Sequence, residues 1–426
     1  MTGHYVLDGM TWIEHELEVP LDHDALGGPT LRVFAREVVP VGESRARPAL
    51  LFLQGGPGGA APRPRAKDGW LGAALAAGFR VVLLDQRGTG RSTPIDPALP
   101  PDDDEAGAAY LARFRADAIV SDAERLRREL LGEDGRWTLL GQSFGGFIAL
   151  HDLSVAPDAL AGVMITGGLP SLERSALDVY RACFAVLERK TRRFAERHPR
   201  EMATLGTLLE HLEEHDVRLP DGSPLRPEGV RQLGFHLGSL KGERVVAEVL
   251  EAAFVGEGGR RTPSYAFLDT MQRLRPFHGS PIYAALHEPI YAQGQATAWA
   301  AQRALEERRA GRADERTAPP WLSAEMVFPW HFEDVVPLRP WRGVAHRLAA
   351  KTDWPTLYDP GVLARNGVPV AALAYAEDLY VPLAFSQETA DAVRGTRLWV
   401  TNEFEHDGIR THGERVFERL WGMLRS

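Results

Sequence analysis

A serine flanked by glycines is the first candidate for chemistry in this sequence. Ser143 stands in "GQSFG", residues 141–145, after a mostly apolar run and before an apolar segment that can continue as a helix. This spacing suits a nucleophile on a sharp strand-to-helix turn, because bulky neighbours would clash there and the next backbone N–H can face a substrate. The alternative is a glycine loop that packs a helix on a sheet, and five residues alone do not decide between the two.

A glycine-proline turn, "GGPG" at residues 55–58, follows the apolar run 49–53. An acyl-transfer serine needs backbone N–H groups that hold the oxyanion of its tetrahedral intermediate. An ordinary tight turn would also explain this motif, since Gly and Pro favour turns. The two motifs together favour the chemical interpretation more strongly than either one alone.

A base and an acid follow late in the chain. A serine hydroxyl is a weak nucleophile unless a neutral imidazole takes its proton, and a carboxylate must orient that imidazole. Asp378 follows the apolar run "VPVAALAYAE", and His406 follows "TRLWVTNEFE". His412, the other histidine after Asp378, precedes the last helical pattern and is interpreted as a surface residue. Glu377 is expected to point away from Asp378 if the strand extends that far, because successive side chains of a strand alternate.

The elements around these residues form an α/β pattern. Residues 12–21, 31–39 and 49–54 predict antiparallel strands that feed a sheet. After residue 55, short apolar runs alternate with helical periods, including one long amphipathic helix over 108–131, which predicts a mostly parallel sheet covered by helices. The pattern is helical from about residue 171 to 354 and α/β again afterwards. We therefore predict a core in two parts, 1–170 and 355–426, with an inserted helical cap at 171–354.

Composition argues against several classes of function. The 426 residues carry 49 basic and 58 acidic side chains, a formal charge of -9, with no long basic tract, so a nucleic-acid partner is not expected. The single cysteine, Cys183, cannot form an intramolecular disulfide and is expected to be a buried apolar residue. No apolar run approaches membrane-spanning length, and no signal-peptide pattern opens the chain. A cytoplasmic protein without a membrane partner is the expectation.

Five segments together resemble the proline iminopeptidase (prolyl aminopeptidase) family of α/β hydrolases: "LQGGPGG", "VVLLDQRGTGRS", "WTLLGQSFGGFIAL", "YAEDLYVP" and "EFEHDG". The long helical insertion suits the larger-cap branch of that family. The order nucleophile, acid, base is the order that α/β hydrolases have. One departure is Gln54, where many members have His.

The resemblance implies a role for each motif residue. Ser143 would be the nucleophile, His406 the general base and then acid, and Asp378 its orienting carboxylate. The backbone N–H groups of Phe144 and of Gly56, or alternatively Gly55, would be the oxyanion donors. The implied reaction is release of N-terminal proline from small peptides through an acyl-enzyme, with no metal and no organic cofactor.

The "DQRGTGRS" turn is the most family-specific of these segments. Its Asp85 and Arg87 are expected to pair with each other and brace the loops around the site.

An enzyme that acts at a chain end must also bind a free amine, and a desolvated cation needs carboxylates. Two cap segments combine acidic with aromatic residues. Glu288 stands near Tyr283 and Tyr291, and Glu325 near Phe328 and Trp330. Glu288 and Glu325 are the predicted amine-binding residues, ahead of Glu333 and Asp334.

Other interpretations stay open at this point. An esterase or amidase of the same fold would use the same three residues, since they fix acyl transfer but not the acyl group. A non-catalytic binding protein on a hydrolase scaffold is the alternative from another class. Dehalogenases and epoxide hydrolases of this fold need an aspartate where Ser143 stands, which excludes them. The sequence gives no indication of the oligomeric state.

Overall fold

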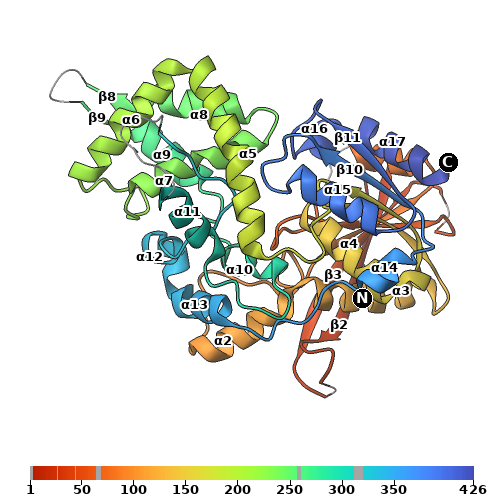
Figure 1. Ribbon diagram of the computed structural model, residues 1–426. Coiled ribbons are helices and arrows are strands. Elements are labelled where there is room, and N and C mark those ends of the chain that lie inside the picture. The colour runs from red at the N-terminus through yellow and green to blue at the C-terminus, as the bar shows by residue number, and fades with distance from the viewer. Residues whose placement is uncertain (1–2, 26, 44, 64–68, 257–260, 311–319) are drawn as a thin grey trace.

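The computed structural model describes residues 3–25, 27–43, 45–63, 69–256, 261–310 and 320–426. A β-sheet covered by helices forms one part of the molecule, on the right in Figure 1. A group of helices, green to light blue in that view, stands against it on the left.

Within the described residues, the main sheet has nine strands in the order β1-β2-β3-β5-β4-β6-β7-β10-β11. The pairs β1·β2, β2·β3 and β3·β5 are antiparallel, and every pair from β5 to β11 is parallel. The strands are β1 (His4–Leu7), β2 (Met10–Pro20), β3 (Thr30–Pro40), β4 (Ala49–Leu53), β5 (Arg80–Asp85), β6 (Trp137–Gln142), β7 (Leu160–Thr166), β10 (Val370–Tyr375) and β11 (Thr396–Thr401).

The prediction of antiparallel strands over the first 54 residues is correct for β2 and β3 but wrong for β4. That strand runs parallel to both of its neighbours, β5 and β6. The connection from β4 to β5 contains helix α1 (Gly69–Ala76), and such a crossover returns the chain in the same direction. The apolar run alone does not show this direction.

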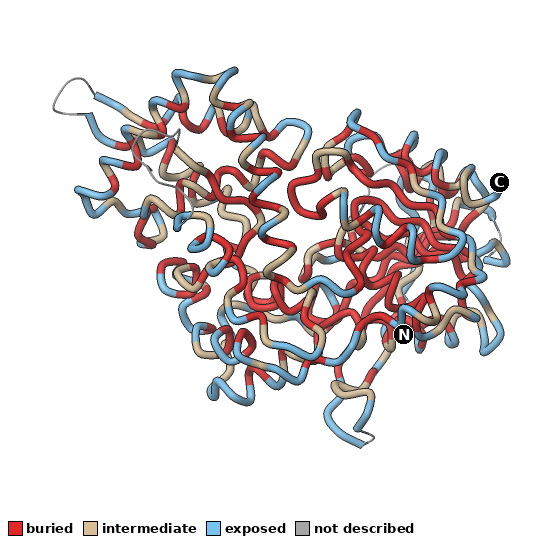
Figure 2. Tube along the Cα trace, in the orientation of Figure 1, coloured by how far each residue is buried: buried red, intermediate tan, exposed pale blue. Residues whose placement is uncertain are grey.

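Both faces of the central strands β4, β5, β6 and β10 are buried, as a parallel sheet requires. Alternate residues of β4 enter two different apolar clusters, with Leu50 and Phe52 in one and Leu51 and Leu53 in the other. The first cluster is completed by α1, α16 (Gly408–Thr411) and α17 (Gly413–Arg425), and the second by α3 (Ala116–Leu131) and α4 (Phe144–Val155). Figure 2 shows the resulting buried interior as a continuous red region along the strands.

The helix predicted over 108–131 is broken in two. Helix α2 (Asp104–Leu111) and a short 3-10 turn end before Arg115, whose extended backbone (φ -86°, ψ -177°) precedes α3. The buried guanidinium of Arg115 donates to the carbonyl oxygens of Pro289, Ala292 and Pro355 at 2.7–3.0 Å. The break follows from these distant acceptors, which the helical periodicity of the segment does not contain.

Most of the chain between β7 and β10 is helical. The second apolar cluster described above continues from the sheet into these helices without interruption. We call residues 171–354 the cap, and its boundaries stay a prediction. Its elements are α5 (Ala176–Arg197), α6 (Pro199–Glu214), α7 (Pro227–Arg231), η3 (Gln232–Gly238), α8 (Gly242–Glu251), β8 (Phe254–Val255), β9 (Thr262–Pro263), α9 (Tyr265–Leu274), α10 (Pro281–Leu286), η5 (Pro289–Tyr291), α11 (Ala300–Ala310), α12 (His331–Asp334), η6 (Val336–Trp341) and α13 (Arg342–Ala350).

The chain returns to the sheet through α14 (Pro360–Ala364), and α15 (Leu383–Ala392) connects the last two strands. Among the described residues, no helix has both the length and the apolar character needed to cross a membrane. The expected cytoplasmic location stays a prediction.

The expected pairing of Asp85 with Arg87 is wrong. Asp85 ends β5 and accepts the N–H groups of Ala61 and Arg91, with the Arg36 guanidinium 3.7 Å away. The chain leaves the strand directly after Asp85, so the two side chains do not share the face that their spacing in a strand would give them.

Arg87 instead forms a buried ion pair with Asp122 of α3, with Nε and Nη2 at 2.7 and 2.6 Å from the two carboxylate oxygens. Its remaining N–H groups donate to the carbonyl oxygens of Pro20, Leu21 and Arg113. One guanidinium therefore joins the turn after β5 to the end of β2 and to the segment before α3.

We expect Arg87→Met to lower the free energy of unfolding by about 3 kcal/mol or more, because it leaves the buried Asp122 carboxylate without its main partner. Chemical denaturation measures the effect. Arg128→Met is a matched control on α3, since Arg128 is half exposed and its ion pairs are long; it should cost less than about 1 kcal/mol. Equal losses in the two variants would contradict the role given to Arg87.

Candidate active site

Ser143 lies on a tight turn between β6 and α4. Its backbone has φ 55° and ψ -125°, a conformation that is rare and strained for a residue with a side chain. The surrounding glycines have direct packing reasons. A Cβ on Gly145 would overlap with the Leu53 carbonyl at the end of β4, and a Cβ on Gly141 would overlap with the backbone of Gly145. The motif therefore lets backbone approach backbone, and the strain is concentrated on the serine.

The "GGPG" turn lies directly beside the serine. A Cβ on Gly55 would stand 2.8 Å from Ser143 Cβ. Phe144 is the first residue of α4, so its N–H has no acceptor inside the helix and lies at the positive end of the helix dipole. Gln54, the departure from the family pattern, is tied by its backbone, because its carbonyl accepts Gln86 Nε2 over 2.8 Å. The roles of Phe144 and Gly56 as oxyanion donors remain proposals.

Asp378 and His406 are hydrogen-bonded partners. His406 Nδ1 lies 2.8 Å from Asp378 Oδ2, and both side chains are buried. The other oxygen of Asp378 accepts the N–H groups of Tyr380 and Val381 at 2.9 and 3.0 Å, which fixes the carboxylate. A carboxylate at Nδ1 keeps the proton on that nitrogen and leaves Nε2 as the base.

Burial by itself lowers the pKa of His406, but the negative charges of Asp378 and Glu325 outweigh it. The pKa of the imidazole is therefore raised above its ordinary value.

The serine and the histidine lie against the same glycine pair after β7. A Cβ on Gly168 would overlap with the Ser143 carbonyl oxygen, and a Cβ on Gly167 would stand 3.1 Å from His406 Nδ1. Ser143, Asp378 and His406 follow β6, β10 and β11, so all three stand at the carboxyl edge of the parallel strands. This is the edge at which α/β sheets bind ligands.

The cap reaches this edge through α10. A Cβ on Gly58 would stand 2.6 Å from Ile282 Cγ2 and 3.2 Å from the Tyr283 backbone nitrogen. The Tyr283 hydroxyl donates to Glu325, and His287 Nε2 lies 3.6 Å from the other oxygen of that carboxylate. Tyr283 therefore joins the "GGPG" turn to an acidic residue of the cap.

Glu325 carries a largely buried negative charge, with 14% of its side chain exposed. Burial raises the pKa of this carboxyl, but His287, Tyr283 and the charge of His406 hold the pKa below its ordinary value. His287 is fixed in turn, because Tyr180 OH lies 2.9 Å from its Nδ1. Of the acidic cap residues that the sequence singles out, Glu325 is the one whose charge acts on His406.

Glu288 has a different setting from the predicted one. Its two oxygens accept the N–H groups of Ala300 and Ala301 at 3.0 and 2.8 Å, so this carboxylate caps the N-terminus of α11. Burial, opposed by these hydrogen bonds, raises the pKa of Glu288 to about 7. We therefore no longer assign the substrate amine to Glu288.

The two lesser candidates lie on α12. Glu333 is exposed, and the buried Asp334 pairs with Arg226 at 3.1 Å.

The structure also brings residues to the site that the sequence reasoning missed. Arg410 Nη2 donates to Gln142 Oε1, which lies beside Gly55. Lys190 and Arg193 of α5 form ion pairs with Glu405 and Glu377, the neighbours of the base and of the acid. Glu377 has a different partner from Asp378, although β10 ends at Tyr375 and strand alternation is therefore not the reason. His412 is exposed, as expected.

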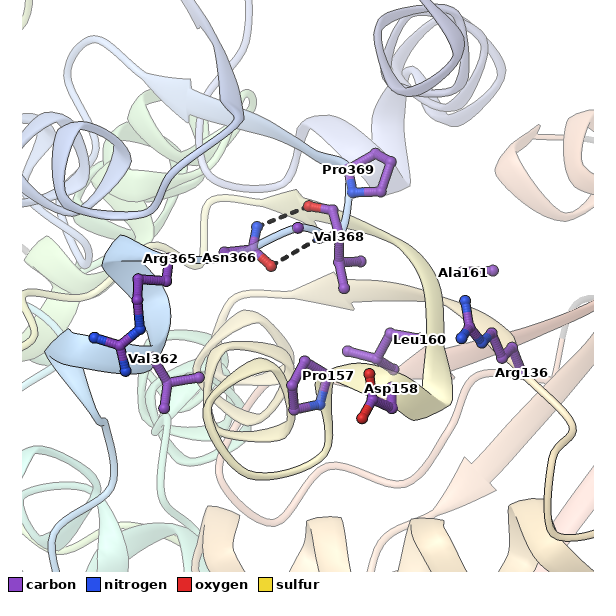
Figure 3. A pocket seen from close by; sticks show the side chains of 11 residues that line it. Arg136, Pro157, Asp158, Leu160, Ala161, Val362, Arg365, Asn366, Val368 and Pro369 are labelled. Atoms are coloured by element: carbon purple, nitrogen blue, oxygen red, sulfur yellow. Dashed lines mark hydrogen bonds between the residues drawn. The ribbon is translucent and has the colours of Figure 1, made fainter.

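A cavity of about 440 Å³ lies elsewhere, at the amino ends of β6, β7 and β10. Figure 3 shows its lining, where the Asn366 side chain is hydrogen-bonded to Val368. It stands at the opposite end of these strands from Ser143 and is separate from the candidate site. In the described ranges, no group of three or more His, Cys, Asp or Glu side chains is arranged to hold a metal ion.

Comparisons with known proteins show what the chain is similar to. A family model described as the alpha/beta hydrolase fold matches residues 48–218. A proline iminopeptidase of Aeromonas sobria is 46% identical over 98% of this chain and 97% of its own length. The proline iminopeptidase aneH of Aspergillus aculeatus is 33% identical over 96% of this chain and 93% of its own. The crystal structure of a proline iminopeptidase from Mycobacterium smegmatis aligns with a TM-score of 0.47 and 16% identity over 96% of this chain and 98% of that one.

The predicted α/β-hydrolase fold and the predicted family are thereby confirmed. The Aeromonas sobria relative matches this chain over nearly the whole length of both proteins. The chain belongs to the proline iminopeptidase family of α/β hydrolases.

Proposed function

We propose that this protein is a serine aminopeptidase that releases N-terminal proline from small peptides through an acyl-enzyme. The observation that carries the proposal is the buried Asp378–His406 hydrogen bond, placed against the same glycine pair as the strained Ser143 turn. The names of the two full-length relatives support the substrate class.

The proposed reaction starts with His406 Nε2 taking the proton of Ser143 as Oγ attacks the carbonyl carbon of the N-terminal residue. Negative charge then develops on the carbonyl oxygen, where the N–H groups of Phe144 and Gly56 stabilise it. His406 returns the proton to the leaving amine as the peptide bond breaks. Water, activated by the same imidazole, then hydrolyses the acyl-enzyme and releases free proline.

Recognition of the chain end is assigned to Glu325. Its carboxylate is largely buried, and its pKa is held below the ordinary value, as binding of a desolvated ammonium requires. The carboxylate lies beside Tyr283, whose backbone meets the "GGPG" turn next to Ser143. A cation at Glu325 is therefore close to the reacting carbonyl, which suits an exopeptidase and not an enzyme for internal bonds.

The first prediction concerns class and substrate. The wild type should hydrolyse prolyl anilide in preference to other aminoacyl anilides and should reject N-acetylprolyl anilide, which lacks the cation. Ser143→Ala should reduce kcat by roughly 10⁴- to 10⁶-fold, because the nucleophile is lost. Steady-state assays with this panel measure both. Efficient turnover of the acetylated substrate would support an esterase or amidase instead.

A second prediction separates the two cap carboxylates. Glu325→Gln should lower kcat/KM for prolyl anilide by about 30-fold or more, since an ion pair worth about 2 kcal/mol or more is lost. Glu288→Gln should leave kcat/KM nearly unchanged and lower the free energy of unfolding by about 1 kcal/mol, because it weakens the cap of α11. Steady-state kinetics and chemical denaturation of both variants measure these effects. A large loss of kcat/KM in Glu288→Gln with little loss in Glu325→Gln would identify Glu288 as the amine-binding residue.

The third prediction concerns the pH dependence of the reaction with Ser143. His406 must be neutral to act as a base, and its pKa is raised above the ordinary value of about 6.5. The rate at which a fluorophosphonate labels Ser143 should therefore begin to fall above pH about 6.5 as the pH is lowered, and we call this fall the acid limb. Glu325→Gln removes one charge that raises this pKa and should shift the acid limb to lower pH. Labelling rates between pH 5 and 9 measure the limb without using the substrate amine. A limb that stays in place in the variant would mean that Glu325 does not act on His406.

A further inference from the structure

The cap holds the loop of the proposed base at consecutive positions. The N–H of His406 donates to the Gly238 carbonyl over 3.1 Å. The next residue, Asp407, accepts the N–H of Leu240 at its Oδ1, also over 3.1 Å. These bonds join the loop after β11 to the segment that follows η3 of the cap.

Lys190 of α5 holds the position before the base. Its Nζ lies 2.7 Å from both carboxylate oxygens of Glu405 and 3.2 Å from the Leu237 carbonyl oxygen. The side chain of Lys190 is 6% exposed and that of Glu405 is 25% exposed. One largely buried cation therefore connects α5, the end of η3 and the His406 loop.

The same helix contacts the loop of the acid. Arg193, one turn after Lys190, places Nη2 at 2.6 and 2.7 Å from the oxygens of Glu377, which precedes Asp378. Both of these side chains are 37% exposed, so this ion pair is the weaker of the two. Helix α5 stands along the boundary between the cap and the sheet (Figure 1) and reaches both loops from there.

We propose that Lys190 is a positioning residue, which holds the His406 loop through Glu405 in the place that proton transfer from Ser143 requires. This inference rests on the proposed function, because His406 is a base only if Ser143 is the nucleophile. Without Lys190 the Glu405 carboxylate loses its ion-pair partner and moves toward water, since burying an unpaired charge is unfavourable. The adjacent imidazole moves with it, and a displacement of about 1 Å at a reacting group can cost about 100-fold in rate.

The test is the rate at which a fluorophosphonate labels Ser143 in folded Lys190→Met. This rate depends on the base and the nucleophile but not on recognition of proline. We expect labelling to be about 10- to 100-fold slower than in the wild type. The kcat for prolyl anilide should fall in parallel while KM changes far less, because Glu325 is untouched. Lys190→Arg, which keeps the cation, should retain most of the wild-type rate.

Arg192→Met is the matched control, since Arg192 lies on the same helix but its side chain is 65% exposed. Its Nη2 is 3.7 Å from Glu188 Oε1, so this ion pair is weak. It should label at the wild-type rate. If Lys190→Met does not fold, Glu405→Gln and the double variant Lys190→Met/Glu405→Gln apply the same test, and the double variant buries no unpaired charge. We expect slow labelling in both, and no slower in the double variant than in Glu405→Gln.

Labelling of folded Lys190→Met, or of these substitutes, at the wild-type rate would overturn the proposal. A lower melting temperature with an unchanged rate would do so too, since that is what a merely structural residue produces. The two proposals fail in different ways. A wild type that labels rapidly at Ser143 but ignores prolyl anilide contradicts the proposed substrate, and the comparison between variants still judges Lys190.

Discussion

The close approach of backbone to backbone at the carboxyl edge of the sheet is the constraint on which the site depends. The end of β4, the start of α4 and the turn after β7 meet where a single added methyl group would overlap with a carbonyl, at Gly145 and at Gly168. These close backbone contacts hold Ser143 in its strained conformation, because the neighbouring segments leave its backbone no room to relax. The apolar layers on both faces of the sheet hold the three segments together and therefore act on the chemistry indirectly.

The cap is joined to this edge by polar groups as well as by the apolar cluster that it shares with the sheet. Apolar packing alone would let helices slide over the catalytic loops, since it is not directional. Ion pairs and hydrogen bonds to residues 405–407 fix both distance and orientation. Gly238 shows how tight this junction is, because a side chain there would overlap with the Tyr380 ring, which stands edge-on to His406 at 4.8 Å between centroids. The cap and the loop of His406 are thus fixed to each other at this junction.

What the sequence could predict follows from where the determining partners lie. The turn of Ser143, the order of Asp378 and His406 and the parallel sheet rest on local patterns, and these predictions agree with the structure. The direction of β4, the break at Arg115 and the partners of Asp85 and Arg87 depend on residues far away in the chain, so local patterns could not show them. Lys190 had a local signal that was missed. It lies on the buried stripe of α5, in line with Tyr180, Cys183 and Leu187, where a lysine needs a partner.

The two cap glutamates show why residue type and neighbourhood do not assign a role. Both glutamates stand beside aromatic rings and close to His287, with Glu288 buried and the Glu325 side chain 14% exposed. The peptide N–H groups of α11 occupy both oxygens of Glu288, whereas Glu325 is held by a tyrosine hydroxyl and an imidazole. Its negative charge also raises the pKa of His406. In the proposed function, a substrate ammonium beside Glu325 would offset that charge and lower the pKa of the imidazole, so that more of it is neutral when a chain end is bound. The proposed amine site and the proposed base would then be linked by one electrostatic field, which a blocked substrate does not change.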